Sequence, residues 1–441
     1  MSTSSTTPQA GESSGETVQS PFSRRDFLRS AAAGAAAATA FGILNPARAQ
    51  GGDVLRVGLI GCGGRGTGAA REALLADPNT QLVAVADVFA DMAENSVKRL
   101  KTDRKIADRV VVDDGHRFVG FDAYKGVIET CDVIVHATPP GFRPQHLRAC
   151  VEAGKHVFTE KPVAVDAPGV RSVMESCAIA RDKGLCVVSG LCYRYEFAKQ
   201  ETIQRLQDGA VGDIVALQTT YNTGGLWHKG REPEWTEMEY QLRNWLYFDW
   251  LSGDHINEQH IHSLDKIMWV LRDLAPAKCT ASGGRAQRTD PKYGNIYDHF
   301  NGVYEWANGV RCFNSCRQWE STSTDVSDWV FGTKGVANIQ DHYIRTYDGV
   351  EWRHESKGPD NMYQNEHNAF LAAIRKGEAR VDEYMCSSTL AAILCRMSAY
   401  TGKTITWEQA LNSQLDLTPK TIDWGDVPMN PLPVPGQTEF V

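Results

Sequence analysis

The sequence lacks several features that would assign a protein to a class at once. It has no excess of positive charge, because 46 Lys and Arg stand against 54 Asp and Glu and the net charge is −8, so we expect no nucleic-acid partner. Beyond the N-terminal region it has no apolar run as long as a membrane span, and it has no internal repeats. Its 42% hydrophobic and 23% charged content is typical of globular proteins.

The 11 cysteines do not form the pattern of a disulfide framework, because they are scattered and odd in number. Cys312 and Cys316 are four residues apart in a strand-like run. Along a strand this spacing is ~13 Å, which is too long for a disulfide. We therefore expect buried or partly buried free thiols.

The N-terminal region resembles an export signal. Arg24 and Arg25 precede an Ala-rich apolar stretch that runs to Leu44, and residues 47–49 offer a small-x-small cleavage site. The paired arginines resemble the twin-arginine signal, which is read by a receptor. This pattern predicts a signal peptide at residues 1–49, the twin-arginine export machinery as a partner, and a periplasmic or secreted protein. The alternative is an N-terminal segment that is retained.

The chain length of 441 residues predicts two domains with tails. Short apolar runs alternate with helix-like stretches over residues 53–192, which predicts an α/β domain with a doubly wound parallel sheet. A second domain is expected over residues 193–415, where strand-like runs occur at 215–221, 302–306, 310–316 and 328–331 and helices are expected at 367–376 and 387–400. Asn308-Gly309 predicts a hairpin turn. Residues 416–441 are rich in proline and predict an extended arm or disorder.

A glycine-rich turn follows the first predicted strand at residues 54–60. Gly61 would permit a tight turn, Gly63 would let the backbone approach a pyrophosphate, and Gly66 would allow close packing of helix on strand. A helix is expected from Thr67 to Pro78, and its first amides would face the phosphates. The turn residues expected to bind a cofactor are Gly61, Gly63, Gly64, Arg65 and Gly66.

Asp87 ends the second predicted strand, 21 residues after Gly66. Strand, glycine turn, helix, strand and acid in this order predict a dinucleotide-binding unit in which the acid binds a ribose hydroxyl. A 2′-phosphate would be repelled by Asp87, by at most ~4 kcal/mol at 4 Å and intermediate dielectric. Val88 and Phe89 follow, and neither could receive that phosphate. NAD is therefore expected as the cofactor, and NADP less so.

Two further strands are expected at residues 133–137 and 156–159. Thr138 follows the first and Glu160 follows the second, so both lie at strand ends, as do Gly61 and Asp87. Ligands of doubly wound sheets bind beyond the carboxyl ends of the strands.

Residues 153–162, which end in Glu160-Lys161-Pro162, resemble the signature of the glucose–fructose oxidoreductase, inositol dehydrogenase and rhizopine-catabolism (Gfo/Idh/MocA) family. The resemblance runs from about residue 55 to about residue 271. Its other matching positions are the glycine turn, Thr138, Pro139, His146, Arg194, Gly209, Gly212, His262 and Asp265.

The resemblance implies a Rossmann domain followed by an α+β domain with a large, mostly antiparallel sheet. It also implies a nicotinamide cofactor and a sugar or polyol substrate. We further expect a homo-oligomer, either a dimer or a tetramer. Lys161 and His262 would flank the reacting carbon. The further residues implied to bind the cofactor are Thr138, Pro139, His146, Glu160, Lys161 and Arg194.

Lys161 precedes a proline, which restricts it to extended backbone at the mouth of the sheet. There it could hold a hydroxyl oxygen or relay its proton. The alternative is a surface lysine in a loop.

The stretch at residues 253–265 is rich in histidine and acids. On one continuous helix, His255, Glu258, His262 and Asp265 would share a face. Three interpretations remain open: an acid/base His262 with an orienting carboxylate, a structural polar helix, or a zinc site made of two histidines and a carboxylate. Glu258 stands where relatives often carry Asp, and we include it as a catalytic candidate.

Residues 219–250 are rich in aromatic side chains, which suit either the apolar faces of a sugar ring or ordinary packing. The aromatic residues are Tyr221, Trp227, Trp235, Tyr240, Trp245, Tyr247, Phe248 and Trp250. His228, Lys229 and Arg231 in the same stretch could reach a polar substrate.

Three functions are compatible with these patterns. The first is an NAD-dependent oxidoreductase that moves hydride to or from a sugar or cyclic polyol. The second is an NAD-dependent enzyme that cleaves glycosides through transient oxidation of the sugar, and the third is a cofactor-dependent binding protein. Free NAD should be scarce outside the cytoplasm, so an exported enzyme is expected to hold its cofactor tightly.

Overall fold

The computed structural model describes residues 53–441. The predicted signal peptide at residues 1–49 lies outside this range. Among residues 53–441, no helix has both the length and the apolar character needed to cross a membrane.

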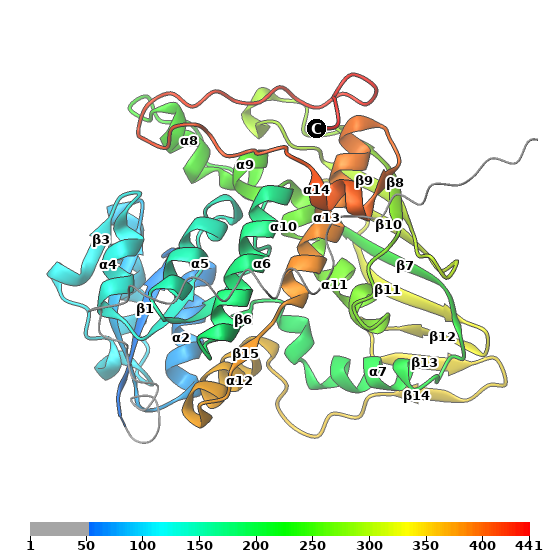
Figure 1. The fold of residues 1–441 in the computed structure, drawn as a ribbon, viewed down its shortest axis with the longest axis horizontal. Coiled ribbons are helices and arrows are strands. Elements are labelled where there is room, and N and C mark those ends of the chain that lie inside the picture. Colours follow the sequence, from blue (N-terminus) through cyan, green and yellow to red (C-terminus); the bar gives the residue numbers. More distant parts are fainter. Residues whose placement is uncertain (1–52) are drawn as a thin grey trace, which may run out of the picture. The chain divides into compact units, whose positions relative to one another are not determined.

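Six strands from residues 55–189 and one later strand form a seven-stranded sheet, sheet A, in which every pair of neighbouring strands is parallel (Figure 1). The spatial order is β3-β2-β1-β4-β5-β6-β15, the doubly wound order of dinucleotide-binding folds. Its strands are β1 (Leu55–Ile60), β2 (Thr80–Asp87), β3 (Arg117–Val119), β4 (Val133–His136), β5 (His156–Thr159), β6 (Cys186–Ser189) and β15 (Arg380–Val381).

Helices cover both faces of sheet A, which explains why the central strand β4 is buried along its whole length. These helices are α2 (Gly64–Ala76), α3 (Ala90–Lys101), α4 (Ala123–Thr130), α5 (Arg143–Glu152), α6 (Ala167–Asp182) and α12 (Met362–Lys376). Helix α2 begins at Gly64 rather than at the expected Thr67, because part of the glycine turn already forms its first turn.

Two of the elements that form or cover sheet A come from late in the chain. Strand β15 pairs with β6, and α12 packs against α2, although both lie beyond the 53–192 range assigned from the sequence. The chain thus returns to sheet A after it has built the second sheet.

The second sheet, sheet B, has nine strands in the order β14-β13-β12-β11-β7-β10-β9-β8-β16. Only the β7–β10 pair is parallel, so the expected mostly antiparallel sheet is confirmed. Its strands are β7 (Ile214–Thr223), β8 (Lys278–Gly284), β9 (His299–Glu305), β10 (Arg311–Gln318), β11 (Asp325–Gly332), β12 (Gly335–Asn338), β13 (Tyr343–Thr346), β14 (Glu351–Arg353) and β16 (Ile405–Thr406).

The predicted hairpin turn joins β9 to β10. Gly309 has a φ of +89°, and its N–H donates to the Trp306 carbonyl at 3.0 Å. Glycine adopts this left-handed conformation without the steric cost that a side chain would add.

Helices pack on one face of sheet B, where α11 contacts β7 and β11, and α13 contacts β8, β9 and α6. The helices of this half are α7 (Phe197–Gln207), α8 (Glu237–Arg243), α9 (Asp249–Ser252), α10 (His255–Glu258), α11 (Ile261–Val270), α13 (Tyr384–Thr401) and α14 (Trp407–Asn412). Short 3₁₀ turns occur at Ala107–Arg109, Asp114–His116, Pro140–Phe142, Cys192–Tyr195, Trp245–Tyr247 and Pro291–Tyr293. All 11 cysteines lie in the described range as buried free thiols.

Residues 413–441 follow α14 as an arm without helix or strand. The arm runs beside α8 (Figure 1), where the Met238 N–H donates to the Gly425 carbonyl at 3.4 Å. Leu417 and Val427 of the arm are buried. The proline-rich segment is therefore an extended arm that packs on its own chain.

Candidate cofactor cleft and active site

The glycine turn has the geometry that the sequence predicts. Gly61 has a φ of +94°, and a Cβ there would lie 2.6 Å from the Ala137 carbonyl carbon. A Cβ on Gly66 would lie 1.9 Å from the Gly61 carbonyl oxygen, so α2 packs directly on the end of β1. By contrast, a Cβ on Gly63 or Gly64 would meet nothing within 4 Å. The space beside these two glycines leaves room for a phosphate to approach the backbone at the start of α2.

A cavity of about 460 Å³ lies against this turn, within the usual size range of ligand sites. Gly61, Gly63, Gly64, Arg65, Gly66, Asp87, Thr138, Pro139 and His146, all predicted to bind a cofactor, line it. The open glycine turn, the cavity and the acid at its far side fit a dinucleotide.

Asp87 stands at the carboxyl end of β2 and accepts hydrogen bonds from the backbone N–H groups of Cys62 (2.7 Å) and Phe89 (3.0 Å). Burial raises the pKa of Asp87 above its usual value, while these two hydrogen bonds oppose the rise. The carboxylate is fixed in place and can accept further hydrogen bonds from ribose hydroxyls.

The ends of β1, β4 and β5 lie at one level, because Ile60 pairs with His136 and His136 pairs with Thr159. Thr138 and Pro139 therefore line the cavity directly beside the glycine turn. His146 on α5 stacks on Tyr124 with ring centroids 4.1 Å apart.

Burial lowers the pKa of His146 to about 3, so its imidazole is neutral near pH 7. As a neutral, stacked ring it contributes a flat wall to the cavity rather than a positive charge.

Arg65 lines the cavity, but its guanidinium is already engaged. It pairs with Glu72 and Glu160, the latter at 3.2 Å, and lies 4.6 Å from the centre of the Tyr363 ring. Glu160 is buried and, with Arg65, ties the start of α2 to the end of β5. Glu160 does not line the cavity and acts in this structure as the partner of Arg65.

The other wall of the cavity comes from the aromatic-rich stretch. We name these residues the roof: Trp227, Lys229, Leu242, Arg243 and Trp245. Most of the remaining aromatic side chains of this stretch pack in a hydrophobic cluster around Tyr247, Phe248 and Trp250. His228 contacts Tyr240 and Lys292 instead of the cavity.

Sequence reasoning considered this stretch for substrate binding or packing and did not assign it to the cofactor cleft. Only the fold brings residues 227–245 opposite Asp87, since nothing in their spacing points to the first domain. Phe89, Phe121 and Tyr124, which also line the cavity, went unrecognised for the same reason.

Lys161, Glu258 and His262 form a second group near the end of β5. The Lys161 ammonium donates to the Glu258 backbone carbonyl at 2.7 Å and to its carboxylate at 3.1 Å. His262 lies in the first turn of α11, partly buried, with its ring 5.2 Å from that of Tyr193 in an edge-on arrangement.

Burial lowers the pKa of His262 well below its usual value, and the positive charges of Lys161 and Lys266 lower it further. Its imidazole is therefore neutral near pH 7, which leaves one ring nitrogen able to accept a hydrogen bond from a hydroxyl group. None of Lys161, Glu258 and His262 lines the 460 Å³ cavity.

Phe142 and Arg143 connect the two groups of residues. Phe142 lines the cavity, and the Arg143 guanidinium donates to the Pro162 carbonyl beside Lys161. Burial lowers the pKa of Arg143 to about 10, although the charges of Glu160 and Glu258 raise it. Sequence reasoning missed Arg143, whose only signal was its position at the start of the helix after β4.

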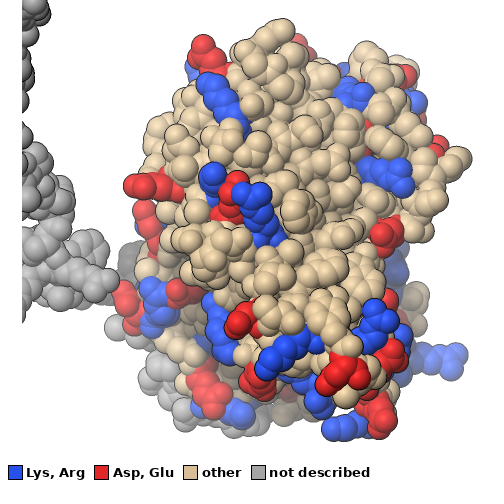
Figure 2. Space-filling view, turned by 90° about the vertical axis from the view of Figure 1, so that its right-hand side faces the viewer, with Lys and Arg blue, Asp and Glu red and all other residues tan. Residues whose placement is uncertain are grey.

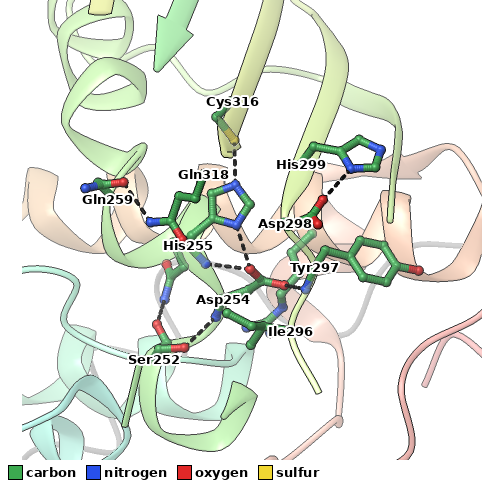
Figure 3. Close-up of polar contacts among 12 residues, drawn as sticks. Ser252, Asp254, His255, Gln259, Ile296, Tyr297, Asp298, His299, Cys316 and Gln318 are labelled. Atoms are coloured by element: carbon green, nitrogen blue, oxygen red, sulfur yellow. Dashed lines mark hydrogen bonds and ion pairs between the residues drawn. The ribbon is translucent and has the colours of Figure 1, made fainter. Parts of the chain in front are cut away.

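The expectation that His255, Glu258, His262 and Asp265 share one helix face is wrong. The segment breaks into α10 and α11 at Gln259 and His260, so the spacing of a continuous helix does not apply. In Figure 3, His255 turns toward Asp254, at 3.0 Å from its carboxylate, and toward Cys316, whose Sγ lies 3.4 Å from Nε2.

The Asp254–His255–Cys316 chain has the residue types of a nucleophilic site, but all three residues are buried and none lines the cavity. Burial also raises the pKa of the Cys316 thiol, which disfavours the reactive thiolate. These bonds hold the start of α10 against β10 (Figure 3) and so position Glu258 at the end of the same helix.

Asp265 and Arg194 form a buried ion pair at 2.8 Å, and Arg194 also contacts Asp273 at 2.5 Å. Ser388 donates to the same Asp265 carboxylate at 2.7 Å. Arg194, which the resemblance implied to bind the cofactor, therefore has its guanidinium bonded to two carboxylates and does not line the cavity. Within residues 53–441, no three His, Cys, Asp or Glu side chains are arranged to hold a metal ion, so the residues of the zinc interpretation are not brought together.

Two family models match the chain. The oxidoreductase family with an NAD-binding Rossmann fold (GFO_IDH_MocA) matches residues 55–191, and the GFO/IDH/MocA C-terminal domain matches residues 200–338. Together these ranges cover more than half of the chain.

Among curated proteins, the chain is 24% identical over 339 residues to the inositol 2-dehydrogenase of Rhizobium meliloti (strain 1021). The match covers 73% of this chain and 89% of that protein. The chain is 25% identical over 210 residues to the 2,7-anhydro-N-acetylneuraminate hydratase of Escherichia coli (strain K12), covering 47% of this chain and 51% of that protein. The chain thus spans about half the length of the second relative.

A solved structure of levoglucosan dehydrogenase, in complex with NADH and levoglucosan, has the same fold. Its TM-score is 0.61 at 17% identity, and the likeness covers 80% of this chain and 99% of that chain. The glycine turn, the cavity and the two family matches show that the chain belongs to the Gfo/Idh/MocA oxidoreductases, whose N-terminal Rossmann domain binds NAD.

Proposed function

We propose that the protein is an NAD-dependent oxidoreductase that transfers hydride between the cofactor and a hydroxyl-bearing carbon of a sugar or cyclic polyol. The observation that carries the proposal is the bond of Lys161 to Glu258 after the end of β5, beside the strand ends that line the dinucleotide cavity. His262 lies near enough to Lys161 for that charge to lower its pKa. The substrate class is supported by relatives that are named inositol 2-dehydrogenase and levoglucosan dehydrogenase.

The residues divide the chemistry of alcohol oxidation between them. NAD, when bound, supplies the acceptor for the hydride. The neutral His262 imidazole accepts the hydroxyl proton, while the Lys161 ammonium donates a hydrogen bond to the substrate oxygen and stabilises negative charge on it. Glu258 holds the ammonium through two oxygens and so fixes its direction.

The test is an assay of the purified protein with NAD and a panel of cyclic polyols and aldoses, read as NADH absorbance. We expect NADH to form in proportion to the oxidised product, which carries a carbonyl group in place of the hydroxyl. The proposal would be contradicted by a protein that binds NAD but neither reduces NAD with any polyol or aldose nor catalyses the reverse reaction with NADH.

The glycoside-cleaving alternative makes a different prediction for the same protein. It requires release of an aglycone from a glycoside without net change in NADH. No contact in the structure favours this function over simple oxidoreduction, so we carry it only as a second arm of the assay, with aryl glycosides as substrates.

We further propose that NAD is held tightly, with a dissociation constant on the order of nanomolar, worth about −12 kcal/mol. The roof supports this proposal because its side chains line the same cavity as the glycine turn and so add a second wall around a bound dinucleotide. The measurement is the nucleotide that denaturation releases from protein dialysed for many hours. Protein that emerges empty, yet turns over with added NAD, would contradict tight retention and leave the oxidoreductase function standing.

Export to the periplasm or beyond is also proposed, on the support of Arg24 and Arg25 in the sequence. Replacing both with Lys should leave the full-length precursor in the cytoplasm, as measured by fractionation. Export of the variant at the normal level would exclude a twin-arginine route.

A homo-oligomer is proposed through the outer face of sheet B. One row of outward side chains across β9, β10, β7 and β11 consists of Val303, Phe313, Gln218 and Trp329. Phe313 is 49% exposed. Figure 2 views the side of the molecule where this sheet lies and shows wide areas without charged side chains. Light scattering that gives the mass of a monomer at micromolar concentration would contradict the proposal.

A further inference from the structure

The C-terminal arm reaches the wall of the cofactor cavity of its own chain. Trp424 of the arm packs against Phe121, with ring centroids 5.0 Å apart, and against Phe89, with centroids 5.7 Å apart. Trp424 is itself 41% exposed and does not line the cavity, whereas Phe89 and Phe121 both do.

Phe89 and Phe121 belong to different loops at the same end of the cavity. Phe89 lies two residues after Asp87, in the loop that follows β2, and Phe121 lies in the loop that follows β3. Asp87 marks the position of the adenosine ribose. Trp424 therefore bridges two loops that enclose the adenosine end of the cleft.

The same arm also binds the roof. The Gly425 carbonyl accepts a hydrogen bond from the Met238 N–H, and the Val427 carbonyl accepts one from the Gln241 side chain, both at 3.4 Å. Met238 and Gln241 lie on α8, which ends with two residues of the roof, Leu242 and Arg243.

Arg243 closes the gap between the two walls. Its guanidinium lies 3.9 Å from the centre of the Phe89 ring and 3.5 Å from the Asp91 carboxylate. The roof is thus in contact with the loop after β2. The arm supports the roof, the loop after β2 and the loop after β3 together.

The arm is fixed on both sides of Trp424. Before it, the Leu417 N–H donates to the Asp166 carboxylate at 2.9 Å. After it, Val427 is buried, and the Pro433 carbonyl accepts a hydrogen bond from the Tyr297 hydroxyl at 2.9 Å. A segment fixed at both ends holds the tryptophan between them in position, even though that side chain is partly exposed.

We propose that residues 416–441 form a strap that retains the cofactor: Trp424 holds Phe89 and Phe121 closed over the adenosine end of bound NAD, and the arm's contacts with α8 hold the roof in place. Release of the dinucleotide requires the roof and these loops to separate, so the strap slows dissociation. The inference rests on NAD binding and is independent of which substrate is oxidised.

The experiment measures the dissociation rate of NADH from the purified full-length protein. Protein loaded with NADH is mixed with excess ADP-ribose, and the loss of the fluorescence of bound NADH is followed. Trp424→Ala removes both aromatic contacts. It should accelerate release about tenfold, because the usual stabilising energy of aromatic pairs corresponds to a rate change of this size. Trp424→Phe should stay within about twofold to threefold of the wild type, because it keeps an aromatic ring at the site.

Met429→Ala is the matched control, since Met429 lies on the same arm and its side chain is 45% exposed. It should release NADH at the wild-type rate. A Trp424→Ala variant that is as thermostable as the wild type and releases NADH at the wild-type rate would overturn the strap, as would equal acceleration by Met429→Ala. Failure of the wild type to bind NADH at all would contradict the cofactor assignment itself and the strap with it.

Discussion

The Lys161 ammonium lies 2.7 Å from the backbone carbonyl oxygen of Glu258 and 3.1 Å from its side-chain carboxylate. This contact joins the end of β5 in the Rossmann sheet to the end of α10 in the second domain. The position where relatives often carry Asp thus holds a Glu whose longer side chain still reaches the lysine. The two domains meet at the residues to which we assign the proton chemistry.

Removal of either reacting side chain should abolish most of the turnover. Lys161→Ala and His262→Ala should each lower kcat by roughly 10²–10⁴, the usual effect of a positioned acid or base. Both variants should keep the wild-type melting temperature within a few degrees and keep their affinity for NAD, because neither residue lines the dinucleotide cavity. Lys125→Ala, on the exposed surface, is the control for loss of a lysine. Near-normal turnover in either variant would remove that residue from the mechanism.

The pH dependence of substrate oxidation should have its acid limb below about pH 6.5, the ordinary pKa of histidine. The pKa of His262 is lowered by burial and by the charges of Lys161 and Lys266, so the neutral base persists until the pH falls through that lowered value. Measurement of kcat/KM from pH 4 to pH 8 checks this. An acid limb centred above pH 7 would contradict a neutral His262, and the limb should be absent from the residual activity of His262→Gln.

Asp87 should set the preference for NAD over NADP. Its partly buried carboxylate, held by the Cys62 and Phe89 backbone N–H groups, would repel a 2′-phosphate. Asp87→Ser should reduce the ratio of NAD to NADP affinity at least about tenfold, as measured by titration of each cofactor. Asp122→Ser, an exposed acid after β3, should leave the ratio unchanged. Tighter binding of NADP than NAD by the wild type would show that the charge argument is wrong.

Two glycines of the same helix provide a matched pair. Gly66→Ala should destabilise the protein by about 1–3 kcal/mol and weaken NAD binding, because its Cβ would lie 1.9 Å from the Gly61 carbonyl oxygen. Gly68→Ala should be tolerated, since its Cβ would lie 3.5 Å from a flexible arginine side chain. Thermal unfolding and NAD titration of both variants decide the matter, and equal behaviour would contradict the close packing of α2 on β1.

Arg194 should act on stability and not on the cofactor. Arg194→Ala leaves the buried Asp265 without its partner, and breaking a buried ion pair in this way usually costs about 3–5 kcal/mol. At a temperature where the variant is folded, its affinity for NAD should equal that of the wild type. A large loss of NAD affinity with unchanged stability would instead restore a cofactor-binding role for Arg194.

The Rossmann half was largely predictable because its signals are local. The glycine spacing, the acid after β2 and the proline after Lys161 each depend on a few adjacent residues, and the bounds of β5 match the strand expected at residues 156–159. Parallel strands also place their carboxyl ends together, which brings Gly61, Asp87 and Thr138 to one cavity without further information.

The second half was less predictable because its contacts join distant segments. The break between α10 and α11 falls at Gln259 and His260, whose side chains bond to Gln318 and Thr219 of sheet B, so contacts with distant strands accompany the loss of the helical spacing. The roof likewise faces Asp87 only because α8 folds back over the first domain. Sequence spacing carries no record of either contact.

The pairing of β15 with β6 places Arg380 beside Cys186, on strands made far apart in time during synthesis. Most of sheet A leaves the ribosome early, yet its edge strand and the helix packed on α2 are the product of residues 362–381. Contacts between such distant segments form late, since a long loop must close first. During synthesis, sheet A therefore has an unpaired edge at β6 and an uncovered helix α2 until the second sheet has been translated. A fragment that ends at residue 192 should accordingly aggregate rather than form a minimal cofactor-binding domain.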